Sequence, residues 1–387
     1  MPRIIVVGAG VIGAACALRL RECGAEVVVV DRAGVAAETS SRCEGNILVS
    51  DKSPGPEAEL AMLSARAWRE LAARLDDDRA PGQPSTEYQA KGGVVVALED
   101  SVDPLRAFAD RQRGIGIRAH ECDPAQVHAL EPHLTPDAAF GVHYPDDAQV
   151  QPSLATQAML ARAIRLGATL RIATVVAALR AGTRIVGVRT STGDLHGDAV
   201  VNCAGPWAGE LAAVLGAHLA VRPRRGTILV TAPMPQRVFH KVYDADYVDA
   251  VASSEADLQT SAVVESTPAG TVLIGSSRER VGFSDRDTLP ALVEVAAKAV
   301  RLFPFLADTT LLRTYHGFRP STPDRLPAIG ADGELAGLFH AAGHEGAGIG
   351  LAPTTAELVA HAVLGTPAPI DPAPFLPTRG RVDESAA

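Results

Sequence analysis

Three glycines near the start of the chain have a spacing that could bring backbone N–H groups close to a phosphate. They are Gly8, Gly10 and Gly13, within the segment Gly8-Ala9-Gly10-Val11-Ile12-Gly13. The first permits a tight turn, the second lets the backbone approach a pyrophosphate, and the third lets a helix pack closely against a strand. The N-terminus of that helix would offer free N–H groups and a positive dipole end to the phosphates.

An acidic residue completes the pattern at Asp31, 18 positions after Gly13. Its carboxylate can accept hydrogen bonds from an adenosine ribose, and it would repel the 2′-phosphate of NADP. The pattern therefore predicts a nucleotide site for NAD or FAD, and the motif alone does not choose between them. A glycine-rich turn without a ligand is the weaker alternative.

Short apolar elements must position this motif. Ile4–Val7 and Ala25–Val30 are β-branched runs typical of strands that are buried on both faces. Ala14–Arg21 is rich in helix-forming residues and is followed by Gly24, which favours a helix end. The N-terminus is therefore predicted to be strand, glycine turn, helix and strand.

Further candidate segments lie where other predicted elements end. A polar loop of small residues follows Asp31 and runs to Asn46, and Asn202–Trp207 follows a predicted strand at Ala199–Val201. A second glycine-rich turn, Gly343–Gly350, follows a predicted strand at Leu338–Ala342 and precedes a helix expected after Pro353. In an open α/β sheet, such strand ends form the ligand crevice.

Composition limits the classes of protein and ligand. The length of 387 residues predicts two domains, and the net charge of −9 without a Lys/Arg cluster argues against nucleic acid. Five cysteines, an odd number without a CxxC pair, support neither a metal site nor a disulfide framework, so we expect a cytoplasmic protein. The longest uncharged apolar stretch, about fifteen residues, predicts no membrane-spanning segment, and peripheral membrane association stays open.

Patterning predicts the remaining elements. Helices are expected at Glu57–Leu75, Asp103–Gly114, Pro124–Leu130, Leu154–Arg165, Ala208–Leu215 and Leu289–Leu302. Strands are expected at Gly92–Leu98, Phe140–Tyr144, Leu170–Val176, Arg184–Thr190, Gly226–Val230 and Gly270–Gly275. The tail from Pro367 is rich in proline and polar residues and is expected to be disordered.

Together, the glycine turn with Asp31, the segment Asn202–Trp207 and the region Gly317–Gly350 resemble the FAD-dependent D-amino-acid oxidase superfamily, which includes glycine and sarcosine oxidases. The resemblance covers nearly the whole chain. It implies an α/β fold with a Rossmann-like FAD-binding domain and an α+β substrate domain with a mixed or antiparallel sheet. The FAD-binding domain would comprise residues 1–50, 151–215 and 316–366, the substrate domain 51–150 and 216–315, and the tail 367–387.

The resemblance also implies which residues contact FAD. Besides the three glycines, these are Val11, Ile12, Asp31, Arg32, Ser40, Ser41, Gly45, Asn46, Val176, Ala204, Gly205, Gly346, Gly348, Ile349 and Gly350. Sarcosine oxidases attach FAD through a cysteine before the substrate arginine, and no cysteine follows Cys203 here. Non-covalent FAD is therefore expected.

Three residues are implied in catalysis. Arg319 matches the family arginine that binds the substrate carboxylate, for which a planar guanidinium is well suited. His344 would line the flavin pocket or assist deprotonation, with a structural hydrogen bond in the turn as the equal alternative. Tyr247 could hydrogen-bond the substrate or serve in packing. Glycine-oxidase-like chains carry a further arginine where this chain has Gly346.

Within the superfamily, Ser41–Lys52 and Gly343–Pro353 resemble the β subunits of D-hydroxyproline dehydrogenases and opine oxidases, and more loosely hydrogen cyanide synthase subunits. This implies oxidation of a small amino or imino acid such as D-hydroxyproline or D-proline, with an α subunit and a small iron–sulfur subunit as partners. An octopine- or nopaline-type opine oxidase and a glycine- or sarcosine-oxidase-like enzyme are the alternatives. A flavin-binding subunit that assembles a complex without turnover is the non-enzymatic alternative.

Overall fold

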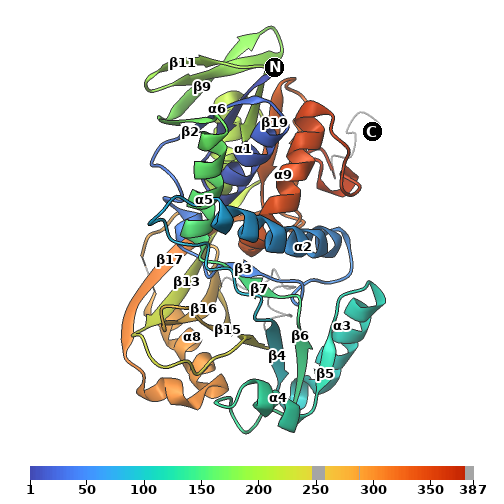
Figure 1. Ribbon diagram of the computed structural model, residues 1–387, viewed down its shortest axis with the longest axis vertical. Helices are drawn as coiled ribbons and strands as arrows, with labels where there is room; N and C mark the ends of the chain where they lie inside the picture. The colour runs from blue at the N-terminus through green and yellow to red at the C-terminus, as the bar shows by residue number, and fades with distance from the viewer. Residues whose placement is uncertain (246–257, 287, 380–387) are drawn as a thin grey trace.

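The structure is a computed structural model that describes residues 1–245, 258–286 and 288–379. A six-stranded sheet occupies its upper half in Figure 1, in the order β18-β19-β12-β1-β2-β8. Five of these strands are parallel, and β18 is antiparallel to β19. The bounds are β1 (Arg3–Val7), β2 (Glu26–Asp31), β8 (Thr169–Ile172), β12 (Ala199–Asn202), β18 (Ala328–Ala331) and β19 (Leu338–Ala342).

Both faces of the central strands β1, β2 and β12 are buried, which explains their apolar runs, whereas the edge strand β8 is mostly exposed. Ile4 and Val6 of β1 face a core shared with the helices α1 (Val11–Glu22), α2 (Pro56–Asp77), α5 (Pro152–Arg165) and α9 (Gly348–Leu364). Ile5 and Val7 face the opposite core. That core is formed by α6 (Ala208–Leu215) and by the meander β9 (Val175–Ala181), β10 (Arg184–Thr190) and β11 (Gly193–His196).

An eight-stranded sheet occupies the lower half of Figure 1, in the order β17-β13-β16-β15-β14-β4-β6-β5. Its strand pairs are antiparallel except β14 with β4. The bounds are β4 (Gly93–Ala97), β5 (His120–Cys122), β6 (Phe140–Tyr144), β13 (Arg222–Thr231), β14 (Lys241–Asp244), β15 (Leu258–Ser266), β16 (Val272–Glu279) and β17 (Leu311–Ser321).

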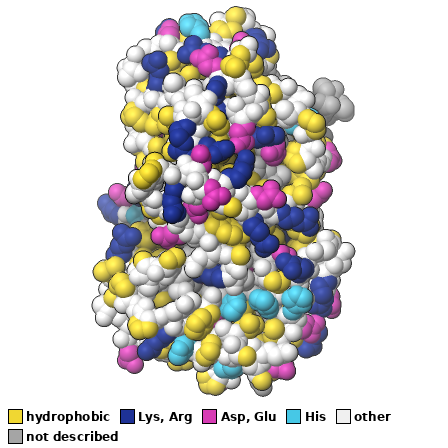
Figure 2. Space-filling view, viewed as in Figure 1, with side chains coloured by type: hydrophobic (Ala, Val, Ile, Leu, Met, Phe, Trp, Pro, Cys, Tyr) yellow, Lys and Arg dark blue, Asp and Glu magenta, His cyan; other side chains and the backbone are white. Residues whose placement is uncertain are grey.

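Helix α8 (Leu289–Leu302) covers one face of this sheet through Val295 and Ala299, and the other face turns toward the six-stranded half. Helices α3 (Val102–Gly114) and α4 (Pro124–Leu130) pack at the β5–β6 end. A two-stranded ribbon, β3 (Asn46–Ile47) with β7 (Ala148–Gln149), connects the halves. On the face shown in Figure 2, acidic and basic side chains are interspersed.

Six short 3-10 helices complete the elements that the structure describes. They are η1 (Thr39–Ser41), η2 (Glu99–Ser101), η3 (Gly205–Trp207), η4 (Pro304–Asp308), η5 (Glu345–Ala347) and η6 (Ala373–Phe375). Three of them, η1, η3 and η5, contact β17. Loops from separate parts of the chain therefore meet at this strand.

The predicted α/β class with a second, largely antiparallel sheet is confirmed. The domain boundaries predicted from the sequence stay a prediction. Asp123 caps α4 as expected, because its side chain accepts from the backbone N–H of Gln126 in a reciprocal capping box. The single strand predicted at Leu170–Val176 is wrong, since β8 ends at Ile172 and β9 begins at Val175 in another sheet.

The expectation that the last helix begins after Pro353 is also wrong. Helix α9 begins at Gly348 and contains Pro353. A proline inside a helix cannot donate to the carbonyl four residues earlier, here that of Ile349. The indole Nε1 of the buried Trp68 donates to that carbonyl oxygen at 2.8 Å, so the backbone group keeps a partner and the helix continues.

The tail is ordered further than its composition predicts. Phe375 is buried, and Arg379 forms an ion pair with Asp324 at 2.7 Å. The expectation of disorder is therefore wrong for residues 367–379. Among the described residues, Glu345–Leu364 is long and apolar enough to cross a membrane by length and composition, but 61% of its apolar window is buried and it packs against α1 and α2. This placement is that of a core helix.

Candidate cofactor and substrate site

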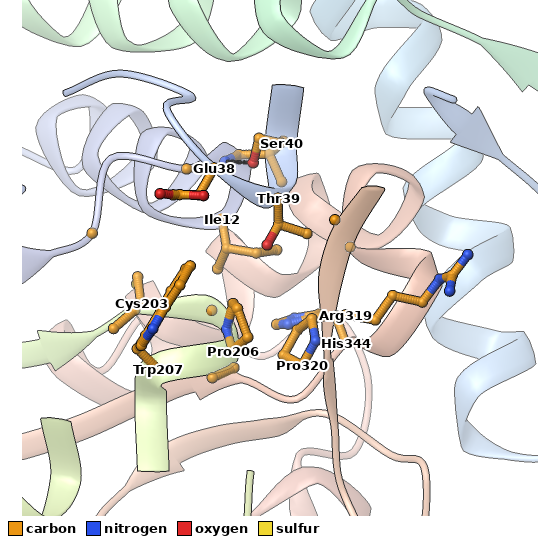
Figure 3. Close-up of a pocket in the computed structure, with 18 of the residues that line it drawn as sticks. Ile12, Glu38, Thr39, Ser40, Cys203, Pro206, Trp207, Arg319, Pro320 and His344 are labelled. Atoms are coloured by element: carbon orange, nitrogen blue, oxygen red, sulfur yellow. Dashed lines mark hydrogen bonds between the residues drawn. The ribbon is translucent and has the colours of Figure 1, made fainter. Parts of the chain in front are cut away.

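A cavity of about 360 Å³ lies where the carboxyl ends of the parallel strands face the antiparallel sheet. Strands β1, β2, β12 and β19 all end at it, as the crevice rule for open α/β sheets requires. Figure 3 shows Trp207 and Cys203 toward one side of this space and Arg319, Pro320 and His344 toward the other. The site is thus built from chain segments that are far apart in sequence.

Steric restrictions account for the glycine spacing. Gly8 has φ +113°, and a Cβ there would collide with the carbonyl oxygen of Cys203. A Cβ at Gly13 would collide with the carbonyl oxygen of Gly8, so α1 could not approach β1 as closely. At Gly10, a Cβ would lie 3.1 Å from the Ser40 hydroxyl oxygen. The turn therefore leaves its backbone open toward the cavity.

Polar groups hold this turn in place. The Asp31 carboxylate accepts backbone hydrogen bonds from Ala9, Ala33 and Gly34, each at 2.8 Å. Ser40 Oγ accepts from the backbone N–H of Val11 at 2.9 Å, at the start of α1. Helix α1 has no acidic residue in its first turn, so its N-terminus suits an anion. The residues present therefore fit a dinucleotide pyrophosphate.

The cavity lining includes most of the predicted cofactor residues. These are Gly8, Gly10, Val11, Ile12, Asp31, Arg32, Ser40, Gly45, Asn46, Ala204, Gly205, Gly346, Gly348 and Ile349. Gly13 lies behind the turn, Ser41 donates to the carbonyl of Glu38 at 2.9 Å, and Gly350 packs against the backbone of Asn46 and Ile47. Tyr247 lies outside the described residues.

The family resemblance implies that the backbone of Val176 contacts the adenine of FAD. The side chain of Val176 is 51% exposed, and the residues beside it that line the cavity are Ala173, Thr174 and Val175. The backbone contact of Val176 stays a prediction.

Arg319 reaches the cavity from β17. Its guanidinium lies over Gly226 of β13, where a Cβ would collide with it, and Nη1 donates to the Ser277 carbonyl at 2.7 Å. Its Nε would lie 3.5 Å from a Cβ at Gly346, so Arg319 occupies the space beside that glycine. The buried Arg278 of β16 also lines the cavity and supplies a second guanidinium from another strand.

His344 is buried beneath the second glycine-rich turn. Its Nε2 lies 3.0 Å from the Thr355 hydroxyl, and burial lowers its pKa to about 3. The imidazole is therefore neutral at physiological pH. His344 lines the cavity and contacts Thr355 of α9 rather than a group of the turn, and its role in catalysis stays a prediction.

Sequence reasoning missed Arg278, and it included Cys43, Glu44 and Trp207 only within candidate segments, without giving any of them a role. Trp207 stacks on Phe283 with ring centroids 4.9 Å apart, and its ring lies 4.3 Å below the guanidinium of Arg32. Burial raises the pKa of the Cys43 thiol to about 12, which argues against a reactive thiolate. The loop sequence Cys43-Glu44 was the available signal, because charged residues are uncommon in a glycine-flanked buried loop.

A cavity closed on one side by a parallel sheet and on the other by an antiparallel sheet is typical of flavin-dependent oxidoreductases. The model of the DAO family, described as FAD dependent oxidoreductase, matches residues 3–362, so the chain belongs to this family. Its cofactor is FAD, and the glycine turn, Asp31 and the N-terminus of α1 are the groups that would hold it.

Similar proteins agree with this assignment. The chain is 32% identical over 383 residues to glycine oxidase of Pseudomonas aeruginosa, covering 97% of this chain and 98% of that protein. It is 29% identical over 425 residues to hydrogen cyanide synthase subunit HcnC of the same species, covering 99% and 97%. It spans about half of the bifunctional ThiO/ThiG protein of Nostoc sp., at 29% identity over 377 residues.

A solved structure supports the fold. Glycine oxidase from Geobacillus kaustophilus superposes with a TM-score of 0.86 at 26% identity, covering 98% of this chain and 99% of that chain. L-Proline dehydrogenase from P. horikoshii has the same fold, with a TM-score of 0.86 at 23% identity, covering 98% and 97%.

Proposed function

We propose that this chain oxidises the C–N bond of a small amino or imino acid by hydride transfer to FAD. The observation that supports this most directly is that two arginines, Arg319 and Arg278, are among the residues that line the FAD cavity. Planar guanidiniums bind carboxylates through two parallel hydrogen bonds. The similarity to glycine oxidase, whose name states its substrate, points to the same class of small carboxylate.

The residues of the chain contribute positioning. Arg319 has room because Gly226 lacks a side chain, and its Nη1 donates to the Ser277 carbonyl, which fixes the position from which the guanidinium would bind a substrate carboxylate. The N-terminus of α9 presents its positive dipole end at Gly348 and Ile349. Bound FAD would supply the acceptor for the hydride, which carries both electrons of the oxidation. Neutral His344 closes the cavity wall without adding a charge.

We further propose a D-hydroxyproline- or D-proline-like substrate and a role as β subunit of a multi-subunit cytoplasmic dehydrogenase. The support is the similarity over 99% of the chain to HcnC, which is itself named a subunit. An α subunit and a small iron–sulfur subunit would then receive the electrons. The alternatives are an opine oxidase β subunit and a glycine- or sarcosine-oxidase-like enzyme, which differ in substrate bulk and in electron acceptor.

Anaerobic reduction tests the proposal. The purified, FAD-loaded chain is mixed with D-proline, cis-4-hydroxy-D-proline, sarcosine, glycine or an opine, and the flavin band near ~450 nm is followed. We expect one of them to bleach the band. Arg319→Ala should weaken that substrate on the order of 100-fold, because charge-assisted hydrogen bonds are lost, and Arg319→Lys should lose less. The exposed Arg111→Ala is the control.

The outcomes separate the alternatives. Bleaching by an opine alone would favour the opine oxidase, and rapid re-oxidation by air would favour an oxidase over a subunit that passes electrons to a partner. Bound FAD that no amine reduces would contradict catalysis by the isolated chain and favour the non-enzymatic assembly subunit. Equal substrate affinity in Arg319→Ala and the native chain would refute the role of Arg319.

A further inference from the structure

Glu44 is a buried carboxylate in the lining of the cavity. It lies in the loop between η1 and β3 and is only 7% exposed. Its Oε2 accepts a hydrogen bond from Asn46 Nδ2 at 3.1 Å. Its Oε1 is buried and has no hydrogen-bond partner among the described residues. A buried carboxylate oxygen without a donor is costly, so this site is incomplete without one.

Neighbouring charges fix how Asn46 faces Glu44. The buried Lys241 of β14 donates to Asn46 Oδ1 and, at 3.0 Å, to Glu265 Oε2 of β15. A lysine ammonium only donates hydrogen bonds, so the amide oxygen of Asn46 must face it. The amide nitrogen is thereby directed at Glu44. Lys241 and Glu265 thus orient Asn46, and Asn46 satisfies one of the two Glu44 oxygens.

Two glycines of neighbouring strands make room for the charged side chains of the site. A Cβ at Gly275 of β16 would collide with the Glu44 carboxylate, as a Cβ at Gly226 of β13 would with the Arg319 guanidinium. Each charge therefore lies close to one glycine of the same sheet.

The strand pairing sets the spacing of these positions. Leu229 of β13 pairs with Ile274 of β16 and Arg225 with Glu279, and the register shifts between these pairs, so Gly275 lies two to three positions out of register with Gly226. Strand spacing and rise then separate the two glycine positions by roughly 8–11 Å. In an α-amino acid, a carboxylate oxygen and the nitrogen lie ~3 Å apart. With one charge-assisted hydrogen bond of about 2.8 Å at each end, the bound amino acid spans a length similar to the separation of the two glycine positions.

We propose that Glu44 binds the nitrogen of the substrate and accepts its proton before oxidation, while Arg319 binds the carboxylate. The inference rests on the proposed function and deepens it, because it assigns a second, oppositely charged anchor. The substrate class is thereby an α-amino or α-imino acid, and a carboxylate without the amine would lack the second contact.

The proton transfer balances without a further reactant. One N–H bond of the substrate ammonium breaks, its electron pair stays on nitrogen, and the proton moves to Glu44, which becomes a neutral carboxylic acid. The neutral amine then has the lone pair that hydride loss from the adjacent carbon requires. The titratable groups that interact electrostatically with Glu44 are Glu265 of β15, Tyr315 of β17 and the neighbouring Cys43, and Lys241 reaches Glu44 through Asn46.

Glu44→Gln and Glu44→Asp test the proposal, with the exposed Glu59→Gln of α2 as control. Retained FAD is read from the visible spectrum. Binding is then measured by perturbation of that spectrum with D-proline and with cyclopentanecarboxylate, which keeps the carboxylate and lacks the nitrogen. We expect Glu44→Gln to keep FAD and cyclopentanecarboxylate binding and to weaken D-proline on the order of 10- to 100-fold.

The pH dependence of flavin reduction gives a second readout. In Glu44→Gln the rate should rise about tenfold per pH unit up to the pKa of the free amine, because solution must then remove the proton. Glu44→Asp, which keeps the carboxylate, should restore the native profile in part. Loss of FAD, or equal weakening of both ligands, would overturn the proposal and assign Glu44 to the cofactor or the fold.

The two proposals fail differently. If the native chain is reduced by an amine and Glu44→Gln matches it in affinity and pH profile, the role of Glu44 is refuted and the proposed function stands. If the native chain binds cyclopentanecarboxylate as tightly as every amino acid offered and is reduced by none, both are refuted.

Discussion

Replacing Lys241 by methionine should destabilise the fold more than any surface change. Lys241 and Glu265 are both almost completely buried and lie 3.0 Å apart, with the lysine also bonded to Asn46. Removing one member of a buried ion pair costs about 3–5 kcal/mol, because the other charge stays buried without its partner. An unfolding entropy of about 2.1 cal/mol/K per residue over 387 residues converts this to a Tm decrease of about 4–6 °C.

The stability lost in Lys241→Met should be larger at high pH than at low pH. Burial already raises the pKa of Glu265, and Lys241 is the largest influence that lowers it. Without Lys241 the folded-state pKa rises further above that of the unfolded chain. The Glu265 carboxyl then releases its proton at lower pH in the unfolded chain than in the folded chain. The stability difference between Lys241→Met and the native chain therefore grows as pH rises. The Tm difference should be smaller at pH 5 than at pH 8.

A double variant separates charge from packing. Lys241→Met with Glu265→Leu removes both ions and leaves apolar side chains, which is close to neutral for many buried pairs. Thermal unfolding of the FAD-loaded chain at both pH values, for the native chain, Lys241→Met and the double variant, provides the measurement. A double variant no more stable than Lys241→Met, or a deficit that does not change with pH, would refute the account of an unpaired buried carboxylate.

Two further predictions concern the cofactor turn and the buried histidine. Gly8→Ala should lose FAD on gel filtration, because φ is +113° and the new Cβ meets the Cys203 carbonyl, whereas Gly24→Ala, with φ +86° and nothing within 4 Å, should retain it. His344 has a pKa lowered to about 3, so the unfolded chain binds a proton below pH ~6.5 that the folded chain does not, and stability should fall by about 1.4 kcal/mol per pH unit on acidification. Denaturant midpoints at pH 7 and 5 should show a smaller loss of stability on acidification in His344→Gln than in the native chain. An equal loss of stability in both would contradict the role of His344.

The sequence predicts best what is determined locally. The glycine turn and Asp31 lie within one strand–helix–strand unit, Gly8 and Gly13 are required by backbone contacts inside that unit or at its neighbouring strand, and Gly10 lies beside the Ser40 hydroxyl of the following loop. The FAD cofactor follows from this unit combined with the family resemblance, and it is confirmed. The helix start at Pro124 was predictable because its capping box involves only four consecutive residues.

The failures come from contacts between distant segments. Pro353 would normally end a helix, but Trp68, from α2, donates to the carbonyl that the proline leaves without a donor. Phe375 is ordered because it is buried against the core, although its surroundings in sequence are rich in proline. In both cases a single long-range contact produces a structure that the local sequence pattern does not predict, and the residues of the segment itself give no indication of that contact.

Glu44 shows the same limit at the site itself. In sequence, Glu44 is an acidic residue in a polar loop after the nucleotide-binding unit, and the neighbouring residues do not predict which groups it contacts. Its position depends on Gly275, which comes more than two hundred residues later, and on Lys241 acting through Asn46. On our proposal, one end of the substrate is bound by the loop of the cofactor-binding half and the other by Arg319 of the antiparallel sheet. Because hydride transfer needs reacting atoms held within about 3–3.5 Å, anchoring the substrate from both halves makes their relative position part of the catalytic geometry.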